Sequence, residues 1–257
     1  MKLIRLLLLI SIFTQPLRSF CWGGEGHKLI GNVAYHYLNP GVKDSLKFYL
    51  GSVSLADAGL WMDEMRKNHE YDYMKPWHYI NIRQGESYKP DTGQNVINEI
   101  NKRIDHLKHR NLCSKEQVAV DIKILVHLCE DLHMPLHAGY ASDTGGNAIH
   151  ITFMGKPTTL HWAWDNDIML QQHITVDSCL ALLAMFSEQR IKEERRADIV
   201  GWMNESRSLL PNVYDYKGDS IDVAYADKNA PIIKLRLALA GLRLSELLNE
   251  LFRAKTN

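Results

Sequence analysis

The chain has 257 residues, of which 46% are hydrophobic and 23% charged, a balance that excludes a mostly disordered protein. Thirty basic residues offset thirty acidic ones, so no broad basic face is expected that could hold long nucleic acid by its phosphates. An enzyme that grips one or two nucleotides through metal ions remains compatible with this charge. Twelve histidines against four cysteines indicate that any metal is held by imidazole and carboxylate rather than by thiolate.

Residues 1–21 have the layout of a secretory signal peptide. Two basic residues precede the apolar run 6–13, and small residues stand before an expected cut in front of Trp22. The apolar run is much shorter than the roughly 20 residues that cross a bilayer, so we expect no stable membrane anchor. A buried N-terminal helix and a lipoprotein that keeps Cys21 are the alternative interpretations. The preferred one predicts a mature chain of residues 22–257 that is secreted or periplasmic.

The remaining chain predicts helices and few strands. Apolar residues three and four apart predict helices over residues 29–38, 42–50, 96–109, 115–132 and 176–195, and a last helix that begins near Pro231 and runs to Phe252. Residues 150–153 are typical of a strand, in a small hairpin. No fixed-period repeat or convincing linker divides these elements. We therefore expect one mainly α-helical domain over residues 22–257, all-α in class, with at most a small β-hairpin.

A histidine and an aspartate stand four residues apart on one of these helices. His127 and Asp131 project from one face of the expected helix 115–132, so both can reach one ion or two neighbouring ions. His137 follows soon after, where Pro135 enforces the end of that helix. The three side chains together are a candidate metal site.

The same spacing recurs twice further along the chain. His161 and Asp165 repeat it, and so do His173 and Asp177, which we interpret as a solvated helix face. One such pair is a weak signal, because an isolated histidine is more often a core or surface residue than a ligand. The set as a whole favours metal binding.

Five groups of residues, in order along residues 22–165, carry a resemblance to a known family. They are WGGEGH from Trp22, WMDEMR from Trp61, WHYIN from Trp77, the segment from Leu125 to His137, and GGN from Gly145 followed by the segment from Leu160 to Asp165. In this order they resemble the single-strand-specific zinc nucleases, the family of the S-one/P-one type. The resemblance implies the mainly α-helical fold that these nucleases share with the zinc-dependent phospholipases C. It also implies three zinc ions per chain at the bottom of a cleft.

The resemblance further implies nine metal ligands in three sets. One ion of a close pair is held by Asp63, His78, His127 and Asp131. The other ion of the pair is held by Trp22, through its amino nitrogen and carbonyl oxygen, by His27 and by Asp131. The third ion is held by His137, His161 and Asp165. Nitrogen and carboxylate donors suit zinc, although manganese and iron accept them too. The amino group of Trp22 exists only after signal removal, which would make that cleavage a chemical requirement.

The activity implied by the resemblance is metal-assisted hydrolysis of single-stranded DNA and RNA to 5′-phosphate products, with 3′-nucleotidase activity. Asp63 and Asp131 take part in catalysis as ligands. Arg66 matches a family arginine that contacts the phosphate, with a surface salt bridge as its other interpretation. Tyr79 stands where the family stacks a base, and core packing is equally open. Asn81 replaces a family aspartate that hydrogen-bonds the base; its amide both donates and accepts and could relax base preference.

Two other classes of function stay open on the sequence. A zinc-dependent phospholipase C is the alternative enzyme, but that family has a longer interval between its tryptophan and first histidine, and a glutamate where Asp165 stands here. A secreted zinc-sequestering protein without turnover is the other possibility, and Arg66 and Tyr79 count against it because storage requires neither. The favoured partner is single-stranded nucleic acid or a nucleotide, bound by a monomer.

Overall fold

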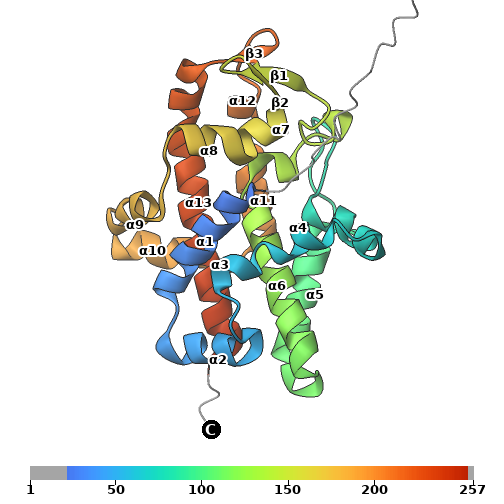
Figure 1. The fold of residues 1–257 in the computed structure, drawn as a ribbon, viewed down its shortest axis with the longest axis vertical. Coiled ribbons are helices and arrows are strands. Elements are labelled where there is room, and N and C mark those ends of the chain that lie inside the picture. The colour runs from blue at the N-terminus through green and yellow to red at the C-terminus, as the bar shows by residue number, and fades with distance from the viewer. Residues whose placement is uncertain (1–21, 254–257) are drawn as a thin grey trace, which may run out of the picture.

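The computed structural model describes residues 22–253, and the expected signal peptide, residues 1–21, lies outside them. Helices carry most of the described chain (Figure 1). The α-helices are α1 (Gly24–Tyr37), α2 (Pro40–Leu50), α3 (Leu55–Ala58), α4 (Trp61–Met65), α5 (Val96–Lys108), α6 (Lys115–Asp131), α7 (Leu160–Trp162), α8 (Ile168–Gln171), α9 (Val176–Ala184), α10 (Glu188–Glu194), α11 (Ile199–Ser208), α12 (Leu210–Val213) and α13 (Val223–Phe252). The tighter 3-10 turns are η1 (His69–His78), η2 (Arg110–Leu112), η3 (Pro135–Ala138) and η4 (Ala141–Asp143), and η5 (Ala163–Asp167) is a π-helical turn.

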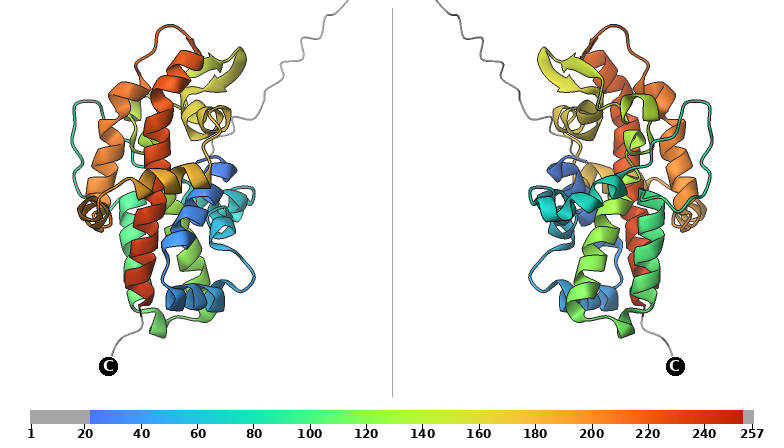
Figure 2. Two further views of the ribbon diagram at one scale, coloured as in Figure 1. Left: turned by 90° about the vertical axis from the view of Figure 1, so that its left-hand side faces the viewer. Right: turned by 90° about the vertical axis from the view of Figure 1, so that its right-hand side faces the viewer.

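Helix α13 runs along most of the molecule, and both side views show it as one continuous rod (Figures 1 and 2). A small sheet lies at its upper end and α2 lies at its lower end. Helix α1 packs mainly against α13, whereas α6 packs against α5 and α13. The two helices lie close together at Gly241 of α13, where an added Cβ would lie 2.5 Å from a methyl carbon of Val33. A larger residue there would force α1 and α13 apart at this point.

The hydrophobic core has two clusters, and α6 ends where they meet. One cluster lies around α2, α5, α6 and the second half of α13, and includes Leu132. The other lies around α1, α7 to α9, the sheet and the first half of α13, and includes Met134 and Leu136. The chain therefore passes from one cluster to the other within a few residues of Asp131, the last residue of α6.

Helix α6 forms as its sequence predicts. The Ser114 hydroxyl caps its start by accepting a hydrogen bond from the Gln117 N–H at 3.1 Å. Its buried residues include the ionisable side chains of Asp121, His127 and Asp131 among aliphatic neighbours. Because polar groups are costly to bury unpaired, their presence here points to specific partners.

The predicted strand forms, and its hairpin is confirmed. Strand β1 (His150–Phe153) pairs antiparallel with β2 (Lys156–Thr159), with His150 opposite Thr159. The two turn residues, Met154 and Gly155, both have positive φ, as a tight hairpin requires. A third strand, β3 (Ser220–Ile221), pairs parallel with β1 and is an addition to the prediction. The all-α class with a small β element is confirmed.

Two of the predicted helices differ most from their predicted bounds. The helix expected over residues 176–195 is broken into α9 and α10, because Ser187 caps a new start by accepting from the Arg190 N–H. The last helix begins at Val223, directly after its capping residue Asp222, rather than near Pro231. Pro231 lies inside α13, at the cost of one backbone hydrogen bond.

Other differences are smaller. Helix α1 begins five residues before the predicted start, at Gly24. Helix α11 and the short helices α3, α4, α7, α8 and α12 have no counterpart among the predicted helices. Over residues 22–253, no helix is both long enough and apolar enough to cross a membrane.

Candidate metal centre

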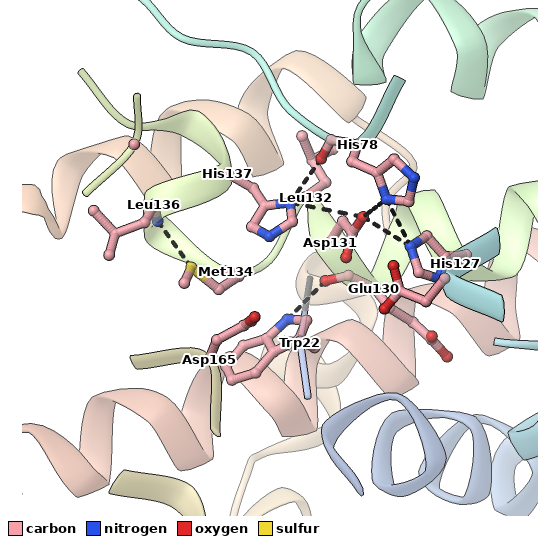
Figure 3. A network of polar contacts seen from close by, with 12 residues as sticks. Trp22, His78, His127, Glu130, Asp131, Leu132, Met134, Leu136, His137 and Asp165 are labelled. Carbon is pink, nitrogen blue, oxygen red and sulfur yellow. Dashed lines mark hydrogen bonds and ion pairs between the residues drawn. The ribbon is translucent and has the colours of Figure 1, made fainter. Parts of the chain in front are cut away.

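Buried imidazole and carboxylate groups converge at the end of α6 (Figure 3). They form three groups, in each of which the possible ligand atoms lie within 4.8 Å of one another. The groups are His27, Asp63 and His127; His78, His127 and Asp131; and His137, His161 and Asp165. These eight side chains are all of the predicted ligands apart from Trp22. The structure thus brings together residues from segments far apart in the sequence.

Asp131 lies at the middle of the centre, and its two oxygens face different groups. Its Oδ2 is 3.1 Å from Nε2 of His127 and 3.0 Å from Nδ1 of His78. Its Oδ1 is 3.6 Å from Nε2 of His27. The side chain is fully buried. A carboxylate placed in this way can bridge two ions.

Backbone carbonyls orient three of the histidine rings through their Nδ1 atoms. The contacts join His127 to Gly59 O at 2.5 Å, His137 to His78 O at 2.7 Å, and His161 to Gly145 O at 2.7 Å. A carbonyl oxygen only accepts, so each Nδ1 carries the proton, and Nε2 is the ring nitrogen that would bind a metal ion. This is the tautomer that a metal ligand needs.

Several atoms of the centre are buried but have no hydrogen-bond partner among the described residues. They are Nε2 of His27, Nε2 of His137, Oδ1 of Asp131 and both carboxylate oxygens of Asp165. Leaving such an atom unpaired costs about 1–3 kcal/mol. All of them are donors of the kinds that zinc accepts, and a cation would satisfy them together. The residues present therefore fit a multinuclear metal centre.

Electrostatic coupling between these groups is strong. Burial, with the nearby His127 ring, lowers the pKa of His27 to about 3. Burial opposes the charged form of His127 as well, but the Asp131 carboxylate outweighs it and raises the pKa of His127 to about 9. Burial likewise raises the pKa of Asp131, yet the imidazoles of His127 and His137 bring it well below the ordinary value. Asp131 thus favours positive charge at His127, which a bound cation would supply in place of the second ring proton.

Two other buried carboxyl groups have raised pKa values. Burial, and then the charge of Asp131, raises the pKa of Asp165 and of Glu130 well above their ordinary values. A divalent cation nearby favours the ionised form of such groups.

The N-terminal end of the described chain is held against this centre. Trp22 is fully buried, and its indole Nε1 donates to the carbonyl oxygen of Glu130 at 2.9 Å. The next residue, Gly23, donates its N–H to the carbonyl oxygen of Asp165 at 3.0 Å. The chain at Trp22 and Gly23 is therefore held to the end of α6 by its indole and to the turn η5 by its backbone.

The third donor group depends on two irregular backbone segments. Asp165 lies in the π-helical turn between α7 and α8, with its Oδ2 3.9 Å from Nε2 of His161. Such turns are frequent at functional sites. The carbonyl that orients His161 belongs to Gly145, whose φ of +62° favours glycine.

The three remaining predicted residues lie beside the ligands. Arg66 is about one-fifth exposed, at 21%, and its Nη1 is 3.4 Å from Oδ1 of Asp63. Tyr79 is 42% exposed and follows His78 directly. Asn81 is half-buried, and its Oδ1 is enclosed near Gly145.

The segment that carries Tyr79 and Asn81 runs beside η3. The Ile80 N–H donates to the carbonyl of His137 at 2.7 Å, and the Ile82 N–H donates to the carbonyl of Gly139 at 3.1 Å. Ile80 and Ile82 are buried in the core. Because side chains alternate along an extended segment, Tyr79 and Asn81 lie on its opposite face.

The sequence analysis missed Glu130 and Gly59. Glu130 is fully buried and contacts His27, and Gly59 supplies the carbonyl for His127. An acidic residue directly after the apolar run 124–129 was the available signal for Glu130. A backbone carbonyl leaves no signal in a sequence.

The known proteins to which this chain is similar are named as nucleases or endonucleases. The family model described as S1/P1 Nuclease matches residues 22–253. The chain is 25% identical to Endonuclease 4 of Arabidopsis thaliana, over 96% of this chain and 94% of that protein. It is 27% identical to Endonuclease 5 of the same plant, over 92% of each chain. It is also 25% identical to Nuclease P1 of Penicillium citrinum, over 90% of this chain and 97% of that protein.

Proposed function

Because this chain belongs to the S1/P1 nuclease family, we propose that it is a zinc-dependent endonuclease acting on single-stranded DNA and RNA. Nuclease activity itself follows from the family. The proposal adds the single-stranded substrate, products that carry a 5′-phosphate, and removal of the phosphate from 3′-nucleotides. The observation that carries it is the convergence of three donor groups around Asp131.

The proposal assigns three zinc ions per chain to nine ligands within one domain, residues 22–257. The assigned ligands are Trp22, His27, Asp63, His78, His127, Asp131, His137, His161 and Asp165. Support comes from the donor types, which are imidazole nitrogen and carboxylate oxygen in every group. Further support comes from the carbonyl contacts at Nδ1 of His127, His137 and His161, which assign Nε2 of each ring to the metal.

Bound zinc would supply Lewis acidity, which makes water a nucleophile near neutral pH and neutralises phosphate charge. The protein holds this chemistry in place through Asp63 and Asp131. Arg66 offers a partly exposed guanidinium beside Asp63, where paired N–H donors can grip two phosphate oxygens. We assign Arg66 to the phosphate in the transition state.

Tyr79 and Asn81 are assigned to the base. Tyr79 is 42% exposed, which leaves its ring available for stacking. Stacking tolerates any base but needs an unpaired strand, so it explains single-strand preference without a basic groove. Asn81 can donate to or accept from a base edge, which predicts a relaxed base preference.

The test uses the mature chain that begins at Trp22, supplied with zinc. Elemental analysis should find three zinc ions per chain. Hydrolysis is then measured on single-stranded DNA, RNA, duplex DNA, a 3′-nucleotide and short-chain phosphatidylcholine. We expect 5′-phosphate products from both single-stranded nucleic acids, phosphate release from the 3′-nucleotide, and slower cleavage of the duplex.

Two results would overturn this proposal. Release of diacylglycerol without nucleotide products would make the chain a phospholipase C. Bound zinc without hydrolysis of any of these substrates would support zinc sequestration instead.

A further inference from the structure

We propose that Glu130 is a positioning residue for the ion assigned to Trp22, His27 and Asp131. The inference rests on the proposed trinuclear centre and adds to it a residue that binds no metal itself. Its carboxylate would hold the His27 ring so that Nε2 faces the ion.

The contact between Glu130 and His27 is short and enclosed. Oε2 of Glu130 lies 2.6 Å from Nδ1 of His27, and both side chains are fully buried. The other oxygen, Oε1, has no hydrogen-bond partner among the described residues. In the ligand state of His27 the Nδ1–H donates to the carboxylate, and Nε2 keeps the lone pair that faces Oδ1 of Asp131 at 3.6 Å.

The same residue also contacts the chain at Trp22. The Glu130 carbonyl oxygen accepts from the Trp22 indole at 2.9 Å, and the next residue is Asp131 (Figure 3). Glu130 therefore touches or adjoins all three residues assigned to one ion. It links them across separations of 103 and 108 residues.

Gly59 makes the space that Glu130 occupies. A Cβ added at Gly59 would lie 2.5 Å from Oε2 of Glu130 and 3.2 Å from its Cδ, too close for either atom to stay in place. The Gly59 carbonyl also accepts from Nδ1 of His127. The rings of His27 and His127 are stacked, with centroids 4.3 Å apart and planes 18° apart. Glu130 and Gly59 thus hold the Nδ1 sides of a stacked pair.

The chemistry predicts a graded effect of substitution. A carboxylate that accepts from the outer nitrogen of a ligand histidine fixes its tautomer and raises its basicity, and losing it weakens metal binding by about 10- to 100-fold. Glu130→Leu removes both the acceptor and the charge. Glu130→Gln keeps an acceptor oxygen but loses the charge, so its loss should be smaller.

The experiment measures zinc retention by the mature chain against chelators of graded strength. We expect Glu130→Leu to lose one of three ions at chelator concentrations that leave the wild type with three, an affinity loss of about 10- to 100-fold. Glu130→Gln should lie between them. Gly59→Ala should lose the same ion, because its methyl group displaces the carboxylate.

A second readout follows the ring directly. In the zinc-loaded protein, NMR of the His27 imidazole should show a hydrogen-bonded Nδ1–H in the wild type and in Glu130→Gln. Glu130→Leu should lose that signal. If Glu130 only filled space, its replacement by leucine would leave the Nδ1–H signal of His27 unchanged. If Glu130→Leu fails to fold, Glu130→Gln and Gly59→Ala still decide the question.

Two matched controls separate positioning from general damage. Glu99→Gln changes another buried carboxylate, which pairs with Arg103 at 2.7 Å on α5, and should keep all three ions. Gly41→Ala adds a methyl group where no atom lies within 4 Å and should also keep them.

The outcomes distinguish this inference from the proposed function. Three ions at wild-type affinity in both Glu130 variants would overturn the role of Glu130 while leaving the nuclease proposal intact. A wild-type chain that binds no zinc would overturn both.

Discussion

Asp131 is the residue on which most of the candidate centre depends. It contacts four imidazoles, those of His27, His78, His127 and His137, and its two oxygens face different donor groups. Removing its carboxylate would leave His78, His127 and His27 without their shared anionic neighbour.

We therefore expect Asp131→Ala to lose more than one of the three zinc ions. Nuclease activity should fall by more than about 100-fold, beyond the range typical of residues that only support a ligand. Elemental analysis and a single-stranded DNA assay measure the two effects. Asp177→Ala is a matched control, because Asp177 has the same His-x-x-x-Asp spacing but is exposed and belongs to none of the three donor groups. Loss of only one ion in Asp131→Ala would contradict the bridging role.

Trp22 gives a second prediction at the scale of one residue. Its amino nitrogen is an amide in any chain with residues ahead of it and then has no lone pair for zinc. A mature chain with two extra residues before Trp22 should bind one ion fewer and be nearly inactive. Proteolytic removal of the two residues should restore activity, which serves as the control. Full activity of the extended chain would show that the Trp22 amino group is not a metal ligand.

At the scale of elements, a charged network joins α10, α11 and α13 beside the end of α6. Glu205 of α11 accepts from Arg236 at 2.8 Å and from Arg243 at 2.6 Å. Arg243 also pairs with Glu194 at 2.7 Å and contacts the buried His133 ring. Burial alone would raise the pKa of Glu205, but Arg243 and then Arg236 lower it below its ordinary value.

The lowered pKa predicts how this network stabilises the fold as pH changes. A carboxylate whose pKa is lower in the folded state stabilises it above the unfolded value, about 4.3, and loses that effect as pH falls through the folded value. Glu205→Gln should therefore cost about 1–2 kcal/mol of unfolding free energy at pH 7, less than a fully buried pair because Glu205 is 45% exposed.

Urea unfolding of Glu205→Gln and wild type at pH 7 and at about pH 3 measures this difference. The two proteins should converge at the acid end. Glu25→Gln, which changes an exposed pair with Lys28, should match the wild type at both values. A difference that does not depend on pH would show that the charge of Glu205 is not what stabilises the network.

At the scale of the whole molecule, the candidate centre lies where the two hydrophobic clusters meet. Its donors come from α1, α4, η1, α6, η3, α7 and η5, so ions bound there would tie these elements together. An ion that binds only the folded state stabilises it by mass action, by about 4 kcal/mol at a thousandfold excess over its dissociation constant.

Chelation should therefore abolish activity and also lower the thermal unfolding midpoint, by roughly 10 °C for a chain of this size. Calorimetry with and without a chelator measures the shift. Added zinc should restore both properties, whereas excess magnesium should not, because imidazole donors suit zinc better. An unchanged midpoint and unchanged activity after complete zinc removal would contradict a structural role for the ions.

The sequence by itself determined the local features of this protein. The spacing of His127 and Asp131 on α6 and the ends of α5 follow from helix periodicity and capping, which act over a few residues. The hairpin of β1 and β2 was predictable for the same reason. Ordered motifs also identified the eight histidines and aspartates that the structure brings together.

Only the tertiary structure decided how distant residues meet. The break between α9 and α10 and the place of Pro231 inside α13 depend on packing that outweighs local preference. The contact of Glu130 with His27 depends on how α1 lies against α6, and the space for it depends on Gly59 at the end of α3. No periodicity encodes such a contact, because it joins side chains about a hundred residues apart through the packing of separate helices.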